Sequence, residues 1–246
     1  MSPARLRGYP TSSNGASSFH LHWGPAVELS EVAVTLEVVT PPGVDDLHFW
    51  ALQASFAGPG GITGAGHLGL QWHSSYPGRT AVNWGGYDAS GTVLAGTESS
   101  LPSALDNPHT RNFEWIAGVP YRLRIYPAGD GRWSGEVSSG SGTVTVRSLY
   151  GGGDRLVGPM VWSEVFARCE APPSAVAWSQ PAGRLLDGSP WEPDSYGVTY
   201  QREEEGGCSN TDVVVLPHGV AQITGVTRTA QPGSVLAARP PNHPAT

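Results

Sequence analysis

Lysine is absent from this 246-residue chain, and its 14 basic residues are all arginines spread along the sequence. Charged residues of both signs make up only 14% of the chain, and the formal net charge is −7. A surface that binds nucleic acid needs clustered Lys and Arg to displace counterions from the phosphates. The sequence therefore predicts no nucleic-acid partner.

Long apolar segments are also missing. No run approaches the roughly 18 consecutive apolar residues that a membrane-spanning helix requires. The first ten residues contain Arg5 and Arg7 without an apolar stretch behind them, which is not the pattern of a signal peptide. The compartment stays open: cytoplasmic, or extracellular if an export signal has been removed.

Cysteine is scarce, with Cys169 and Cys208 as the two residues of this type. A bond between them would close a loop of about 40 residues and stabilise the fold by about 3–4 kcal/mol. Two free thiols are the alternative in a cytoplasmic protein. Because the compartment is unknown, both states remain open.

The sequence also lacks the common catalytic motifs: G-x-S-x-G, the P-loop, G-x-G-x-x-G after a strand and H-E-x-x-H. No cofactor is predicted. Glu164, next to Trp162 in an expected strand, is a weak catalytic candidate, because an enclosed carboxyl group has a shifted pKa. The alternative is a satisfied polar group at a strand end.

A metal site is not predicted either. His20 and His22 flank Leu21, so on a strand they point to the same side and could supply two imidazole ligands to zinc. Nothing in the spacing identifies a third ligand. His20 and His22 are therefore weak candidates, and two exposed histidines near a terminus are the alternative.

Glycine and proline, in contrast, are abundant, with 33 and 22 residues. Between these turn formers, apolar residues alternate with polar ones, as in Val32, Val34 and Leu36, and this period of two indicates half-buried strands. Strands are predicted over 32–38, 47–56, 67–73, 79–88, 119–126, 132–138, 143–150 and 156–167. The polar segment 94–112 predicts a long loop. The predicted fold class is all-β, a two-sheet antiparallel β-sandwich.

The pattern changes after Pro181, where loop-like segments and short apolar runs replace long strands. We expect a sandwich over 1–181, a C-terminal β/loop extension packed on it over 182–238, and a disordered tail over 239–246. A small separate β-domain is the alternative for the second segment.

Polar side chains share one face of the expected strands. Gln71 and His73 alternate with apolar residues, and so does Asn83 on the next strand. Amide, imidazole and guanidinium groups can bind sugar hydroxyls, and an indole can stack on a sugar ring. The predicted ligand-binding residues are Gln71, His73, Asn83, Arg122, Arg124 and Trp133. An ordinary solvated sheet face is the alternative.

Four short motifs carry a resemblance to a known family. They are Gly66-His67-Leu68-Gly69-Leu70-Gln71, the run from Val82 to Asp88, the run from Phe113 to Tyr121, and the run from Trp162 to Phe166. Their succession resembles an uncharacterised, mostly bacterial family of concanavalin-like β-sandwich domains (domain of unknown function 3472). The resemblance covers about Phe19 to Pro181 and departs at His67, where the family prefers an aromatic residue. It implies a concanavalin-like jelly roll and export from the cell, and it brings no established activity.

The leading functional hypothesis is a lectin-like module that binds carbohydrate or another small polar ligand. One alternative is an enzyme on the same scaffold, either a polysaccharide lyase or glycoside hydrolase, or a small-molecule isomerase. A structural or interaction protein without catalysis is the other alternative. The analogy with sugar-binding proteins rests on fold, and a fold does not determine a function.

Overall fold

The computed structural model describes residues 4–105 and 107–238. Within these residues the chain forms sixteen β-strands and two short 3-10 helices, Pro77–Arg79 and Glu203–Glu205. The predicted all-β class is therefore confirmed. No helix in the described part of the chain has the length and apolar character to cross a membrane. The tail predicted over 239–246 lies outside the described residues.

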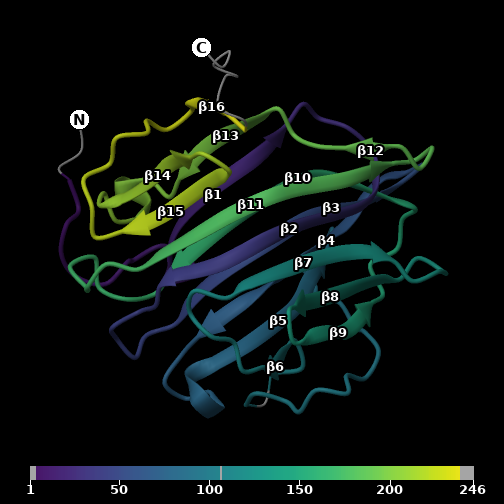
Figure 1. Cartoon of the computed structure of the whole chain (residues 1–246), viewed down its shortest axis with the longest axis horizontal. Helices are drawn as coiled ribbons and strands as arrows, with labels where there is room; N and C mark the ends of the chain where they lie inside the picture. The colour runs from purple at the N-terminus through teal and green to yellow at the C-terminus, as the bar shows by residue number, and fades with distance from the viewer. Residues whose placement is uncertain (1–3, 106, 239–246) are drawn as a thin grey trace.

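The strands build two antiparallel sheets, which Figure 1 shows one in front of the other. The first sheet runs β16 (Val235–Ala237), β13 (Ser195–Tyr200), β1 (Ser17–Gly24), β10 (Arg155–Val165), β3 (His48–Gly58), β4 (Gly61–Trp72), β5 (Thr80–Asp88) and β6 (Thr110–Asn112). The second sheet runs β14 (Thr211–Leu216), β15 (Gly219–Thr224), β11 (Ala175–Leu185), β2 (Leu29–Thr40), β7 (Pro120–Pro127), β8 (Trp133–Ser139) and β9 (Gly142–Leu149), and β12 (Pro190–Trp191) pairs with β11. One pair, Leu29 with Leu156, connects the sheets.

The core lies between the two sheets. From the second sheet, Val32, Val34 and Leu36 are at most 1% exposed, which confirms the face that their alternation predicted. From the first sheet, Trp50 and Leu52 alternate with outward residues and meet them in the same apolar cluster. Full burial of one such side chain stabilises the fold by about 1.5–3 kcal/mol.

The predicted strands correspond to β2, β3, β4, β5, β7, β8, β9 and β10, with ends shifted by a few residues. The described residues of the segment 94–112 form a loop apart from isolated bridges and the three-residue β6. Strands β1, β11 and β13 were not among the predicted strands. Pro181 and Gly183 interrupt the alternation of β11, whereas Phe19, Leu21 and Trp23 of β1 do alternate with His20 and His22.

The C-terminal residues differ from the extension that the sequence predicted. The expected boundary at 181 falls inside β11, a strand paired with β2 on one side and β15 on the other. After it, β13 pairs with β1 in the first sheet, and β14 and β15 continue the second. Residues 182–238 therefore complete both sheets of one sandwich.

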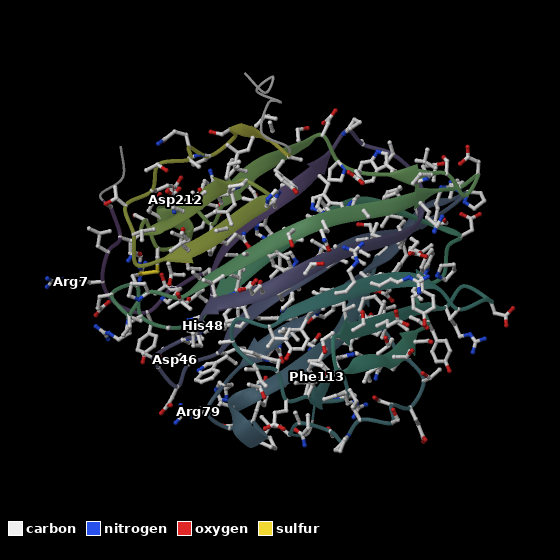
Figure 2. The ribbon with its side chains drawn as sticks, viewed as in Figure 1. Arg7, Asp46, His48, Arg79, Phe113 and Asp212 are labelled. Atoms are coloured by element: carbon white, nitrogen blue, oxygen red, sulfur yellow. A yellow bond between two sulfur atoms is a disulfide. The ribbon has the colours of Figure 1, made fainter. Side chains whose placement is uncertain are left out.

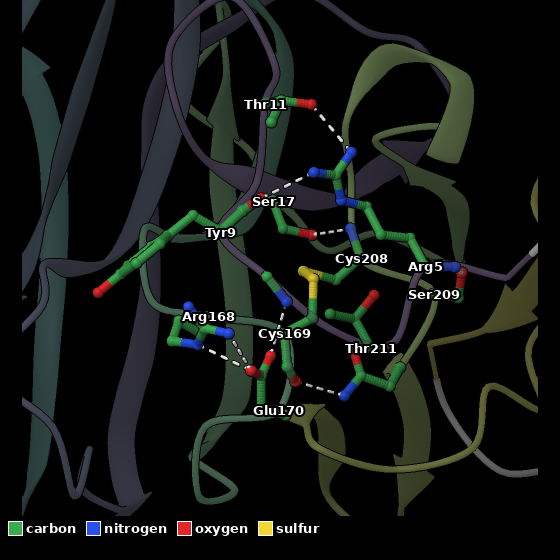
Figure 3. Close-up of a disulfide and its surroundings, with 12 residues drawn as sticks. Arg5, Tyr9, Thr11, Ser17, Arg168, Cys169, Glu170, Cys208, Ser209 and Thr211 are labelled. Carbon is green, nitrogen blue, oxygen red and sulfur yellow. Dashed lines mark hydrogen bonds and ion pairs between the residues drawn. A yellow bond between two sulfur atoms is a disulfide. The ribbon is translucent and has the colours of Figure 1, made fainter.

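A disulfide joins Cys169 to Cys208, so of the two states left open by the sequence, a bond or two free thiols, the structure has the bond. Figure 3 shows the N-terminal segment beside this bond. The Cys169 N–H donates to Gly8 O at 2.9 Å, and the Ser209 N–H donates to Arg5 O at 2.9 Å. The bond thus lies where the N-terminal segment meets both the end of β10 and the loop before β14.

Candidate functional site

A row of paired residues crosses the outer face of the first sheet. Glu164 on β10 pairs with Phe49 on β3, and Phe49 pairs with Gln71 on β4. Directly paired residues project from the same face of a sheet. Neighbouring strands are about 4.8 Å apart, so the α-carbons of Glu164 and Gln71 lie about 10 Å apart, with Phe49 between them. The weak catalytic candidate and one predicted ligand-binding residue thus lie on the same face of the sheet.

Glu164 is held through one of its two carboxylate oxygens. Asn14 Nδ2 donates to Oε1 at 3.0 Å, and Ser18 Oγ donates to the same atom at 3.4 Å. Burial raises the pKa of Glu164 above its usual value, and the bonds from Ser18 and Asn14 partly offset this rise. An enclosed carboxyl group with a raised pKa is suited to accepting and returning a proton.

The amide of Gln71 has a fixed orientation. Its Oε1 accepts hydrogen bonds from Tyr76 OH at 3.0 Å and from Thr110 Oγ1 at 3.2 Å. Thr110 Oγ1 in turn accepts a bond from Asn83 Nδ2 at 2.9 Å. None of the described residues accepts a hydrogen bond from Gln71 Nε2. Both N–H groups of this amide are therefore left without a protein acceptor in the described part of the chain.

A cavity of about 480 Å³ opens beside Glu164 on this face. Phe49, Ala51 and Trp162 form an apolar cluster here that is separate from the main core. Trp162 Nε1 donates to Gln53 Oε1 at 2.9 Å, which fixes the indole against Phe49. Phe49 and Trp162 line the cavity, so part of its wall is aromatic.

Three histidines also line the cavity. Burial is the main cause that lowers the pKa of His20 and of His67 to about 4, with smaller contributions from His22 and His109 respectively. Burial, followed by the charge of Arg147, also lowers the pKa of His109. Arg147 Nη2 lies 3.3 Å from His109 Nδ1, and arginine can only donate, so the His109 proton is on Nε2. At neutral pH these imidazoles are uncharged.

The predicted metal candidates are neighbours on this face. The rings of His20 and His22 are 6.0 Å apart, and His22 Nε2 lies 3.1 Å from Thr199 Oγ1. Within the described ranges, no group of three or more His, Cys, Asp or Glu side chains is arranged to hold a metal ion.

Asn83 joins Gln71 on the predicted face, but Arg122 and Arg124 do not, which corrects the expectation of one common surface. Both arginines lie on β7, in the second sheet, so the apolar core separates them from Gln71. Arg124 pairs with Glu31 at 2.7 Å, and Arg122 donates to the Gln180 carbonyl oxygen.

Trp133 and His73 also differ from their predicted places. Trp133 is 1% exposed, stacks on Phe56 and donates to Gly152 O, so it belongs to the core and has no open ring face for a sugar. His73 follows the end of β4, where its Nδ1 accepts a bond from the Ser75 N–H at 3.1 Å. It belongs to the turn before Pro77–Arg79 rather than to the sheet face.

Asn14, Phe49 and Gln53 line the cavity but were not among the predicted site residues. Phe49 and Gln53 alternate with buried Trp50 and Leu52, so their outward direction was available from the pattern. Their position was not, because it depends on β3 lying between β10 and β4. Asn14 precedes the first strand and carries no pattern at all.

Comparison with known proteins identifies the fold. No family model and no curated protein matches the chain, so the likeness to domain of unknown function 3472 stays a resemblance. Scytalido-glutamic peptidase, solved with a peptide-based transition-state analogue, is similar with a TM-score of 0.52 at 11% identity, over 85% of this chain and 98% of that one. SCP-B of the eqolisin family of peptidases, in complex with the tripeptide Ala-Ile-His, is similar with a TM-score of 0.51 at 12% identity, over the same shares. The chain has the concanavalin-like antiparallel β-sandwich fold of these proteins.

Proposed function

We propose that this protein is a hydrolase that cleaves peptide bonds on the outer face of the first sheet, with Glu164 as general base and acid. The observation that carries the proposal is the row Glu164–Phe49–Gln71, in which a carboxyl group of raised pKa and an unengaged amide donor share one face. The similarity in fold to two peptidases supports the same reaction class.

The residues suggest a direct attack by water. Ionised Glu164 takes a proton from a water molecule through Oε2, because Asn14 and Ser18 occupy Oε1. The water oxygen bonds to the scissile carbonyl carbon, and Gln71 Nε2 donates to the oxygen that becomes negative. Glu164 then returns the proton to the amide nitrogen as the carbon–nitrogen bond breaks. The products are a carboxylic acid and an amine.

The cavity fits an uncharged, partly apolar substrate. Phe49 and Trp162 provide an aromatic wall, and the neighbouring imidazoles of His20 and His67 are neutral above about pH 4. Glu164 is the single carboxylate among the described residues that line this cavity. Glycoside hydrolysis in most families requires two carboxylates across a cleft, so this arrangement favours the peptidase over the glycosidase.

The test is cleavage of a denatured protein substrate between pH 3 and pH 8, followed by mass spectrometry of the fragments. We expect the wild-type chain to cut and Glu164→Gln to lose about 10²–10⁴-fold in rate. Gln71→Ala should lose about 10²–10³-fold, mainly in kcat. Glu136→Gln is the matched control, because Glu136 pairs with Arg124 in the second sheet. Absence of cleavage at every pH, or equal rates for Glu164→Gln and wild type, would overturn the proposal.

A carbohydrate-binding module is the second candidate. The same cavity combines aromatic rings with the amides of Gln53, Asn83 and Asn107, groups that recognise sugar hydroxyls and ring faces. A glycan array with the wild-type chain and the Trp162→Ala variant tests it. Binding that depends on Trp162, together with no peptide cleavage, would favour this candidate over the peptidase.

A further inference from the structure

The segment before β1 reaches over the candidate catalytic carboxyl group. Asn14 Oδ1 accepts a hydrogen bond from the Ala16 N–H at 3.1 Å. Because a backbone N–H can only donate, this bond fixes the direction of the side-chain amide. Its Nδ2 is therefore the group that faces Glu164, and it donates to Oε1 at 3.0 Å.

This segment is anchored along its length. The Thr11 N–H donates to Gly206 O at 3.0 Å, and Arg5 donates to Thr11 Oγ1. The Gly8 N–H donates to Glu170 Oε2 at 2.8 Å, next to the disulfide (Figure 3). Asn14 is thus held over Glu164 by a segment whose contacts lie on both sides of the Cys169–Cys208 bond.

We propose that Asn14 is a positioning residue that binds Glu164 through Oε1 and thereby reserves Oε2 for proton transfer with the reacting water. This inference rests on the proposed function, because it assigns Asn14 a part in that reaction. A hydrogen bond from a neutral donor stabilises the ionised carboxylate and so counteracts the rise in pKa that burial causes. Asn14 therefore sets the pH above which Glu164 can act as a base.

Other titratable groups face the same cavity: His20 from β1, His67 from β4, Tyr87 from β5 and His109 from the loop before β6. Burial lowers the pKa of each of these histidines, and for His20 and His67 it does so to about 4. Burial thus shifts the titration of these histidines to lower pH and the titration of Glu164 to higher pH. A change in that titration after substitution of Asn14 therefore reports on the contact between the two side chains.

Two substitutions separate positioning from a merely structural role. Asn14→Ala removes the donor, so the pKa of Glu164 should rise by about one unit. Asn14→Asp keeps the shape and the Oδ1 acceptor but places a second carboxylate against Oε1, so the rise should be larger. If Asn14 had only a structural role, Asn14→Ala would shift the pKa of Glu164 more than Asn14→Asp, because the isosteric change to Asp disturbs the fold less.

The titration is followed by NMR of the full chain labelled with ¹³C at the glutamate carboxyl groups, with Glu164→Gln identifying the Glu164 resonance. The acid limb of kcat/KM should move to higher pH in the same order as the NMR midpoints. Gln231→Glu is the control, because Gln231 is exposed and the substitution adds the same charge as Asn14→Asp. This control should shift neither the NMR midpoint of Glu164 nor the acid limb of kcat/KM.

Equal midpoints in wild type and both variants, or a larger shift for Asn14→Ala than for Asn14→Asp, would overturn the role of Asn14. The NMR titration does not depend on turnover. If the wild-type chain cleaves no peptide, the proposed function fails, and the NMR midpoints still decide whether Asn14 controls Glu164.

Discussion

At the scale of single residues, the site depends on side chains whose hydrogen bonds leave one atom unused. Gln71 accepts twice at Oε1 and keeps Nε2 as a donor, and Glu164 accepts twice at Oε1 and keeps Oε2. In both residues, hydrogen bonds from neighbouring side chains occupy Oε1 and leave the other polar atom, Nε2 of Gln71 or Oε2 of Glu164, able to contact a ligand. A site whose donors and acceptors are already oriented does not need to reorganise when charge develops on the substrate.

His48 provides a prediction on pH and stability. It is 1% exposed at the start of β3, its Nδ1 lies 3.0 Å from Asp46 O (Figure 2), and burial lowers its pKa to about 4. The unfolded chain takes up a proton at this histidine below about pH 6.5, whereas the folded chain does so near pH 4. The free energy of unfolding should therefore fall as pH falls from 6.5 to 4, by about 2–3 kcal/mol for this histidine.

His48→Asn keeps a donor for Asp46 O and removes the titrating group. Urea unfolding at pH 7 and pH 4.5 should show a smaller loss of stability for the variant than for wild type. The same loss in both proteins would mean that His48 is not the source. His20 and His67 remain in both proteins and contribute equally to each.

At the scale of elements, the close contact of β3 and β4 produces the row that joins Phe49 to Gln71. Gly69 pairs with Ala51 two residues away from this row, and a Cβ atom at Gly69 would lie 1.9 Å from Trp50 O. Backbone atoms cannot give way as a flexible side chain can. The absence of a side chain at Gly69 is therefore what allows the two strands to pair at this point.

Gly69→Ala should consequently lower the free energy of unfolding by about 1–3 kcal/mol or more, because the strands must separate or shift. Gly60→Ala, in the turn that joins the same two strands, meets no atom within 4 Å and serves as the control. Thermal unfolding of both variants checks the prediction. A loss at position 60 as large as that at position 69 would contradict it.

At the scale of the whole molecule, segments from three parts of the chain meet at the disulfide. Cys169 follows β10, Cys208 precedes β14, and the N-terminal residues bind beside both. Disulfides persist in oxidising compartments, so we expect this protein to act outside the cytoplasm. Hydrogen bonds to residues beside this bond hold the segment that carries Asn14, which connects overall stability to the site.

The double variant Cys169→Ser/Cys208→Ser should lose about 3–4 kcal/mol of unfolding free energy, because the unfolded chain regains the freedom of the closed loop. Hydrogen exchange should also become faster at the amides of Gly8 and Thr11, which bond to the residues around the disulfide. Unchanged urea midpoints would show that the bond contributes little. The wild-type chain measured with and without a reducing agent is the control for the effect of the serines.

The sequence by itself determined the features that follow from alternation along one strand. It identified Val32, Val34 and Leu36 as a core face and placed Gln71 and Asn83 together on an outer face, because neighbouring side chains of a strand point to opposite sides. It offered Glu164 only as a weak candidate for an enclosed carboxyl group, beside the alternative of a satisfied polar group at a strand end. These are local properties, and the two-sheet architecture follows from them in outline.

Tertiary structure alone decided which strands became neighbours. Glu164, Phe49 and Gln71 form one row because β3 lies between β10 and β4, a long-range pairing set by burial of the whole core rather than by any short pattern. Other long-range pairings placed Arg122 in the second sheet and Trp133 in the core, and they brought residues 182–238 into both sheets. Alternation fixes the side of a strand on which a residue lies, and only the fold determines what stands beside it.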